Sequence, residues 1–424
     1  MKNTANQFSS KTRCRTCCII SGKNLLYRRF FYVFFRDCRK TGISKFRYCA
    51  YRPLQRKLKK RRVIPILTAL NNGQLFTLQA YHVREQLIQF RKGRSFLCPA
   101  CKAPVVLKVG TTKIPHFSHL QQYACTPGSE PETQLHLLGK SRLASFFHEK
   151  NIPAQIEKYL PPIKQRPDLL VKNSAIEFQC SALPIEQVLK RSQGYEKTGI
   201  NAIWIRSLEH TPATGMGIFQ IRPFERAMFR SASLHPHLLH FNPHLSLFIY
   251  YSNLFYVQGN RWIGKASLLP ADAQSFPFAV PKMAAKKEYA QAIALMRIEN
   301  NKFVRSQLFA KNRMRNPFWR LSYELQLDRE AIPEIFGLPL AGGHLLTEHP
   351  VIWQMKAALM IESGKPVDTL LTDGLVKLAP AGVDEPSLMK VLLAYETLYR
   401  KCRSASFPEV VDISYHLLAK AWEN

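Results

Sequence analysis

Short, mainly apolar segments separated by polar residues appear first in residues 63–127. Residues 66–71 and 74–78 are two such segments, separated by Asn72-Gly73, a dipeptide typical of tight hairpin turns. The pattern predicts two short strands, a connecting helix at residues 81–90 and a further apolar strand at residues 105–109. We therefore expect residues 63–127 to form a small β-rich module.

The apolar spacing then changes to that of a helix. Between residues 132 and 149, apolar side chains recur along one helical face. Glu132, His136 and Lys140 follow one another at four-residue spacing on another face, and Pro153 ends the segment. The pattern predicts an amphipathic helix with a polar stripe.

Short strand-like segments alternate with one more helix up to residue 222. Strands are expected at residues 154–159, 168–171 and 175–178, a helix opened by Pro184 at residues 185–194, and a buried strand at residues 201–205. Helix, three strands, helix, strand is the order of the restriction-endonuclease-like αβββαβ core, an α/β layer fold. We therefore predict a nuclease-like domain over residues 128–222.

Residues 223–424 are predicted to form a C-terminal domain of strands followed by helices. Strands are expected within residues 245–257, a proline-marked linker at 269–281, and helices at 288–297, 350–361 and 387–400. Residues 282–320 hold ten basic side chains and two acidic ones, interleaved with Phe303, Phe309, Phe318 and Trp319. This composition suits phosphate contact with base stacking, or equally a solvated helix face over a buried aromatic stripe.

Length and charge restrict the class of protein. A chain of 424 residues with a net charge of +32 can form two or three domains and favours a polyanionic partner, although a basic chain can also bind membrane surfaces. Residues 1–62 hold 19 Lys and Arg against one acidic residue. Three interpretations of this tail remain: a disordered arm that binds DNA, a second cysteine-based metal site, or upstream sequence translated from a misassigned start.

The location is predicted from apolar runs and cysteines. No apolar run approaches the roughly 18 residues needed to cross a bilayer. The longest candidate, residues 30–35, is short, is flanked by arginines and lacks a signal-peptide cleavage site. Five of the ten cysteines lie in the tail and the others are scattered, which is not the pattern of a disulfide framework. We expect no membrane span and a cytoplasmic location.

A Cys-x2-Cys pair is followed, after fourteen residues, by His-x2-His. Cys98, Cys101, His116 and His119 match the ligand types of a tetrahedral structural Zn²⁺ site. Such a site would stabilise a module too small to build its own core. Cys125 could replace one of the histidines. A closed set of four ligands leaves no position for catalysis, so the expected role of zinc is structural.

Two adjacent predicted strands carry carboxylates. Asp168 stands in Arg-Pro-Asp at the start of one, and Glu177 lies on the next, two residues before Gln179. Oxygen ligands of this kind suit Mg²⁺ or Mn²⁺, which can stabilise charge on a phosphodiester and activate a water. The spacing is that of the PD-(D/E)xK nuclease core, with Gln179 in the usual place of lysine.

Taken in order, these segments resemble the competence protein CoiA family. The matching residues include Phe96-Leu-Cys-Pro-Ala-Cys101, His116-Phe-Ser-His119, His136-Leu-Leu-Gly-Lys140, Arg166-Pro-Asp168 and Glu177-Phe-Gln-Cys-Ser181. The resemblance covers residues 66–207 well, is looser towards the C-terminus and is absent from 1–62. It implies a nuclease core behind an N-terminal zinc-ribbon-like module, linked to natural transformation and recombination.

The resemblance also suggests roles for further residues. Glu132 would complete the carboxylate set around the catalytic metal, and His136 would orient a carboxylate or move a proton. Gln179 can orient water but cannot supply the positive charge of a lysine. That charge and the contact with DNA are assigned to four side chains: Lys140, Lys190, Arg191 and Tyr195.

Three functions are compatible with these observations. The favoured one is a metal-dependent deoxyribonuclease that processes incoming single-stranded or branched DNA, with competence or recombination proteins as partners. The second is a non-catalytic DNA-binding or recombination-accessory protein that retains the fold, for which Gln179 is the best support. The third is a protein-interaction scaffold, for which DNA binding would be weak and insensitive to salt.

Overall fold

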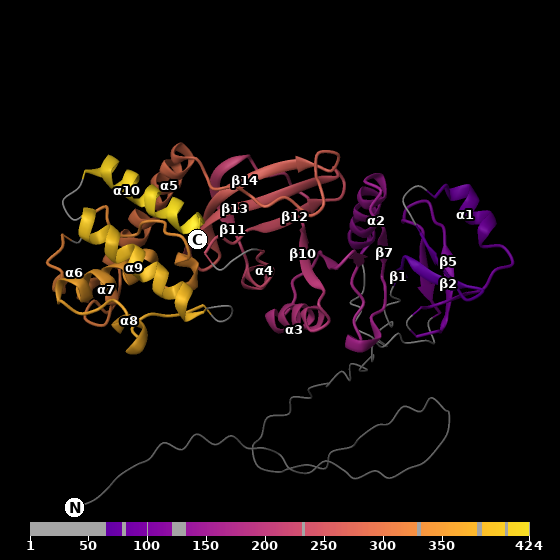
Figure 1. The fold of residues 1–424 in the computed structure, drawn as a ribbon, viewed down its shortest axis with the longest axis horizontal. Coiled ribbons are helices and arrows are strands. Elements are labelled where there is room, and N and C mark those ends of the chain that lie inside the picture. The colour runs from indigo at the N-terminus through magenta and orange to yellow at the C-terminus, as the bar shows by residue number, and fades with distance from the viewer. Residues whose placement is uncertain are drawn as a thin grey trace, which may run out of the picture. The chain divides into compact units, whose positions relative to one another are not determined.

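In the computed structural model the chain divides into two units, residues 1–59 and 60–424. The structure describes residues 65–78, 82–99, 101–120, 133–230, 234–328, 332–379, 384–402 and 406–423, all within the second unit (Figure 1). The predictions made for residues 1–62 lie outside the described residues. Among the helices of the described ranges, none is both long and apolar enough to cross a membrane.

A six-stranded antiparallel sheet forms the N-terminal module. Its strand order is β1-β6-β5-β4-β2-β3. The hairpin β2–β3 turns at Asn72 and Gly73, whose φ angles of 49° and 81° are those that this short turn requires. The β-rich module predicted at this end of the chain is confirmed. The sheet strands and the helix have these bounds: β1 Pro65–Ile66, β2 Thr68–Asn71, β3 Gln74–Thr77, α1 Arg84–Phe90, β4 Phe96–Leu97, β5 Pro104–Lys108 and β6 His116–His119.

A mixed eight-stranded sheet follows, in the order β11-β14-β13-β12-β10-β9-β8-β7. Its first part has the predicted order of helix, three strands, helix, strand: α2 Gln134–Glu149, β7 Ala154–Ile156, β8 Leu169–Val171, β9 Ser174–Gln179, α3 Ile185–Glu196 and β10 Asn201–Ser207. Strand β9 runs antiparallel to β8 and parallel to β10. The predicted α/β class is confirmed.

The sheet continues beyond residue 222. Strand β12 (Leu238–Asn242) pairs in parallel with β10, and β13 (Leu247–Gln258), β14 (Arg261–Pro270) and β11 (Gly215–Gln220) extend the sheet in antiparallel pairs. The short helix α4 (Pro223–Arg226) connects β11 to this part. The boundary predicted between residues 222 and 223 therefore does not divide the sheet, because the strands after it complete the same layer.

Helix α2 packs unusually close to strand β9. A Cβ added at Gly139 would lie 1.8 Å from a ring carbon of Phe178, so only glycine fits at this point of the helix. Glycine in a helix interior costs about 1 kcal/mol relative to alanine. The close approach brings the polar stripe of α2 against the strands that carry Asp168 and Glu177.

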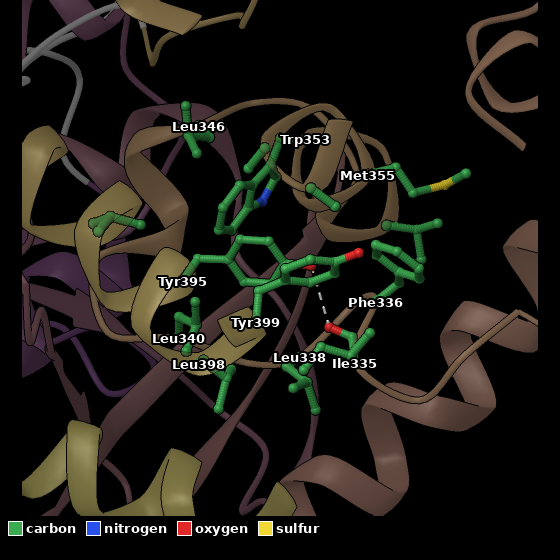
Figure 2. Packing of buried hydrophobic residues seen from close by; sticks show 14 of the residues in the cluster. Ile335, Phe336, Leu338, Leu340, Leu346, Trp353, Met355, Tyr395, Leu398 and Tyr399 are labelled. Atoms are coloured by element: carbon green, nitrogen blue, oxygen red, sulfur yellow. Dashed lines mark hydrogen bonds between the residues drawn. The ribbon is translucent and has the colours of Figure 1, made fainter. Parts of the chain in front are cut away.

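Helices form most of the C-terminal part: α5 Lys286–Leu308, α6 Pro317–Glu324, α7 Pro350–Glu362, α8 Thr369–Thr372, α9 Glu385–Cys402 and α10 Phe407–Glu423. They share one hydrophobic cluster, whose centre is drawn in Figure 2. Trp353 of α7 packs edge-on against Tyr395 of α9, whose hydroxyl donates to the carbonyl of Ile335 at 3.5 Å. The predicted change from strands to helices is confirmed.

Candidate functional site

Asp168 directly precedes strand β8 and contacts three groups. Its Oδ2 accepts from the backbone N–H of Phe178 at 2.8 Å and contacts His136 Nε2 at 3.0 Å, while Lys140 Nζ is 3.7 Å from Oδ1. Burial alone would raise the pKa of Asp168, but the charge and hydrogen bond of His136, together with Lys140, hold that pKa well below its usual range. Asp168 is therefore a fixed, ionised carboxylate.

Lys140 is fully buried and joins the two sheets. Its Nζ donates to Oε1 of Glu157, the residue directly after strand β7, at 2.5 Å. Glu157 in turn accepts from the Thr68 hydroxyl at 2.9 Å and from the Leu67 N–H at 3.3 Å, both in the N-terminal module. Burial opposes ionisation of Glu157, yet Lys140 and Arg166 lower its pKa. The ion pair therefore ties helix α2, the nuclease-like sheet and the N-terminal sheet together.

Glu177 lies in the middle of strand β9 and is almost completely buried. Its Oε1 accepts from Arg191 and from the hydroxyl of Tyr195, one turn apart on helix α3. Burial raises the pKa of Glu177, Arg191 lowers it and Asp168 raises it, with the balance at about 7. The charge of Asp168 is thus one of the influences on the protonation of Glu177.

Gln179 ends strand β9, and its side-chain amide bonds to Ser181. Its Nε2 donates to the carbonyl of Ser181 at 2.9 Å. Arg206 of β10 donates to the carbonyl of Gln179 at 2.7 Å and forms an ion pair with Glu225 at 3.2 Å. The turn after Gln179 is therefore fixed by main-chain and side-chain bonds to Ser181 and Arg206.

The other predicted site residues are placed as follows. His136, Lys140, Arg191 and Tyr195 converge on the carboxylates, whereas Lys190 is exposed on α3. Glu132 lies outside the described residues. The full burial of Lys140 and Tyr195 argues against the predicted direct contact of these two side chains with DNA, since a phosphate cannot reach them. Lys140 instead contacts Glu157 and Asp168, and Tyr195 bonds to Glu177.

A second group of ligand atoms lies in the N-terminal module. One ligand atom each from Cys98, Cys101 and His119 lies within 4.8 Å of the others, and Cys101 Sγ is 3.3 Å from His119 Nε2. A tight turn brings the thiols together: the N–H of Lys102, at φ 59°, donates to the carbonyl of Cys98. Two thiolates and an imidazole at this spacing are ligands that Zn²⁺ prefers.

His116 does not join this group, in contrast to the predicted ligand set. His116 and His119 are three residues apart on strand β6, so their side chains point to opposite faces of the sheet. The Nδ1 of His116 instead donates to the carbonyl of Ile114 at 2.7 Å. Side chains alternate between the two faces along a strand, so a spacing of three residues on one strand already excluded a shared ligand set. The alternative ligand Cys125 lies outside the described residues.

Comparison with known proteins finds matches within one family. The model of the competence protein CoiA N-terminal domain matches residues 80–127, and that of the CoiA nuclease-like domain matches residues 132–282. Competence protein CoiA of Bacillus subtilis (strain 168) is 27% identical over 271 residues, covering 62% of this chain and 71% of that protein. The matches to both CoiA domains and to this relative support the CoiA family for the chain. No solved structure matches significantly.

The CoiA nuclease-like match includes both carboxylates and the sheet extension as far as β14. Sequence reasoning missed Glu157 and Arg206, which connect the site to its surroundings. Neither stands in a motif or at a diagnostic spacing. The only available signal was that Glu157 is a lone acidic residue within the predicted strand 154–159, and such residues are common on surfaces.

We predict that Lys140→Met lowers the free energy of unfolding by about 3–5 kcal/mol, because it leaves Glu157 buried without its countercharge. Adding Glu157→Gln should recover part of this loss, with a coupling of about 0.5–3 kcal/mol. Urea unfolding of the two single variants and the double variant measures this coupling. Lys158→Met, the same change at an exposed neighbour, should cost less than about 0.5 kcal/mol. Additive losses from the two single variants would contradict the coupling.

Proposed function

We propose that this CoiA-family protein is a metal-dependent deoxyribonuclease acting on incoming DNA in natural transformation. The observation that carries the proposal is the pairing of Asp168 and Glu177 on adjacent strands, each next to a cation from a flanking helix. Family membership and a nuclease-like domain support the proposal. Cytoplasmic location and competence or recombination proteins as partners remain predictions.

The donor set at this pair suits Mg²⁺ or Mn²⁺. Mg²⁺ commonly uses one or two carboxylates and completes its shell with waters and substrate phosphates, so Asp168 and Glu177 are sufficient protein ligands. Glu132, the predicted third carboxylate, would add to them. The bound metal supplies charge stabilisation at the phosphate and a lower pKa for the attacking water. His136 holds Asp168 in orientation, since its Nε2 contacts the same oxygen as the Phe178 N–H.

Arg191 offers the positive charge that Gln179 cannot supply. The Arg191 guanidinium donates to Glu177 and remains partly exposed, with 29% of its side chain accessible. It lies over the Trp204 ring at 5.6 Å, which fixes its plane. A guanidinium so held is suited to a phosphate oxygen next to the carboxylate pair. The hydrogen bond of Gln179 to Ser181 favours the second candidate function, a DNA-binding protein that retains the fold without the chemistry.

A basic and aromatic surface in the C-terminal part supports DNA as the partner. We define the α5–α6 surface as residues 305–323. Phe309 and Tyr323 are 86% and 77% exposed, and the Arg313 guanidinium lies 4.8 Å from the centre of the Trp319 ring. Trp319 and Phe318 pack against the helical core, as the alternative interpretation of this segment predicted. The exposed rings and cations are suited to base stacking and phosphate contact.

We expect Asp168→Asn and Glu177→Gln each to lower the rate of Mn²⁺-dependent DNA cleavage at least about a hundredfold, since each removes a metal ligand while conserving side-chain size. Gel assays on single-stranded, duplex and branched substrates measure this loss. DNA affinity should stay close to that of the wild type. Glu186→Gln, the same change at an exposed site on α3, serves as the control and should cleave normally. Undiminished cleavage by the purified Asp168→Asn and Glu177→Gln double variant would refute the assignment.

We further propose a structural Zn²⁺ held by Cys98, Cys101 and His119. Elemental analysis of the purified chain should give about one zinc per molecule, because two cysteines and a histidine close together are ligands typical of a structural zinc site. Cys98→Ser combined with Cys101→Ser should abolish zinc content and destabilise the N-terminal module. His116→Asn should retain zinc, because His116 lies on the other face of β6. Equal zinc loss in His116→Asn would show that this ligand set is misassigned.

The α5–α6 surface should contribute most of its DNA affinity through charge. Replacing Lys311, Arg313 and Arg315 by Glu should weaken binding of single-stranded DNA at low salt at least about tenfold and flatten its salt dependence, because fewer counterions are released. Fluorescence anisotropy at several salt concentrations measures both effects. As a control, Glu would replace three exposed lysines outside this surface, Lys365, Lys377 and Lys401, which changes the net charge by the same amount. If this control triple weakens binding as much, the effect is one of net charge and not of the surface.

A further inference from the structure

A cavity of about 740 Å³ adjoins the proposed catalytic residues. It lies where β9 and β10 end, and its far wall is formed by β11 and by residues of β12 and β13. Leu135 and Cys180 line it, and these are the chain neighbours of His136 and Gln179. Sites for small ligands have volumes of roughly 300–1,000 Å³. The cavity is therefore large enough for one small ligand next to the site of cleavage.

One wall of the cavity is aromatic. Phe219 of β11 and Tyr251 of β13 stack with ring centres 4.4 Å apart and planes inclined by 24°. The ring of His240, on β12, meets Tyr251 edge-on at 4.8 Å. Phe219 is only partly buried, unlike the other two rings. Flat rings of this kind suit a planar heterocycle.

The cavity also contains a buried polar group that lacks a partner. His240 is 3% exposed, and its Nδ1 has no hydrogen-bond partner among the described residues. Burial, with the nearby charges of Arg206 and His210, lowers the pKa of His240 to about 3, so the imidazole is neutral at physiological pH. A buried polar atom without a partner costs free energy. Because Nδ1 is closed to solvent in the observed rotamer, a ligand recovers that cost when the imidazole turns towards the cavity that His240 lines. A neutral imidazole can donate to or accept from the edge of a nucleobase.

Cations lie at the same cavity. Arg206 is fixed by Glu225 and by the carbonyl of Gln179, and Arg222 is exposed at the rim. Glu209, the one exposed acidic residue of the lining, lies 3.9 Å from His244. A ligand with a flat base and a phosphate would match the rings, His240 and the arginines together.

We propose that this cavity binds one unpaired nucleotide of the DNA strand next to the scissile phosphate, with its base against Phe219 and its edge bonded to His240. The inference rests on the proposed nuclease function and specifies its substrate class. A base held in a duplex is stacked and paired, so it can enter the cavity only after extrusion, which costs its stacking and pairing free energy. The cavity thus selects single strands, frayed ends and branch points over intact duplex.

A fluorescent base analogue tests the proposal in the full chain. We would place 2-aminopurine at successive positions of a single-stranded oligonucleotide and measure its fluorescence at saturating protein, with Ca²⁺ present to prevent turnover. One position should show a large change in intensity, because the analogue is buried against Phe219. Phe219→Leu should remove that change and weaken binding about tenfold. Phe309→Leu, the same change on the α5–α6 surface, should weaken binding but leave the position-specific change.

His240 provides a second, independent pair of variants. His240→Phe keeps the edge contact with Tyr251 but cannot form a hydrogen bond, and should lose the position-specific change. His240→Asn retains a polar group near the place of Nδ1 and should restore part of it. Circular dichroism and thermal unfolding establish whether each variant folds. If the His240 variants do not fold, the result for Phe219→Leu decides whether the nucleotide site exists.

The outcomes separate this inference from the proposed function. Binding with no position-specific change, or a change that survives in Phe219→Leu, overturns the nucleotide site while leaving nuclease activity intact. A change that Phe219→Leu removes, in a protein that does not cleave with Mn²⁺, supports the site and refutes the nuclease. No binding of the oligonucleotide at low salt overturns both proposals.

Discussion

The burial of the Lys140 ammonium constrains the arrangement of everything around the candidate site. A charge taken fully out of water is tolerated only beside a countercharge in good geometry, and Glu157 and Asp168 provide it. Glu157 can do so only because it is also bonded to Thr68 and Leu67 in the N-terminal sheet. Gly139 permits the helix to approach strand β9 closely enough for this contact. The position of one lysine thus depends on both sheets at once.

The same arrangement gives the two metal-binding candidates different environments. Asp168 is surrounded by donors and stays ionised, whereas Glu177 is buried deeper and relies on Arg191 and Tyr195. Lys140 of α2 therefore lies beside Asp168, directly before β8, and Arg191 of α3 lies beside Glu177 on β9. In the nuclease signature a single lysine follows the second carboxylate. Here Gln179 occupies that position, and the charge lies on side chains distant in sequence but adjacent in space.

The sequence predicted the parts of the molecule that depend on local periodicity and turn chemistry. Asn72-Gly73 located the first hairpin, and the alternation of helices and strands gave the order of the nuclease-like core. The four-residue spacing of His136 and Lys140 correctly placed them on one face of a helix, and both contact Asp168 in the structure. Their burial was not predictable, because it depends on the packing of α2 against β9. The contact of Glu157 with Thr68 and the separation of His116 from His119 are likewise products of strand pairing and strand faces.

Mn²⁺ binding tests the central claim that Asp168 and Glu177 form a metal site. Electron paramagnetic resonance of free Mn²⁺ would be followed during titration with the full chain, with and without single-stranded DNA, whose phosphates complete the metal shell. The account predicts a site in the wild type that DNA strengthens, that Asp168→Asn and Glu177→Gln both lose, and that Glu186→Gln retains. Equal Mn²⁺ binding by the wild type and the two site variants would contradict the account.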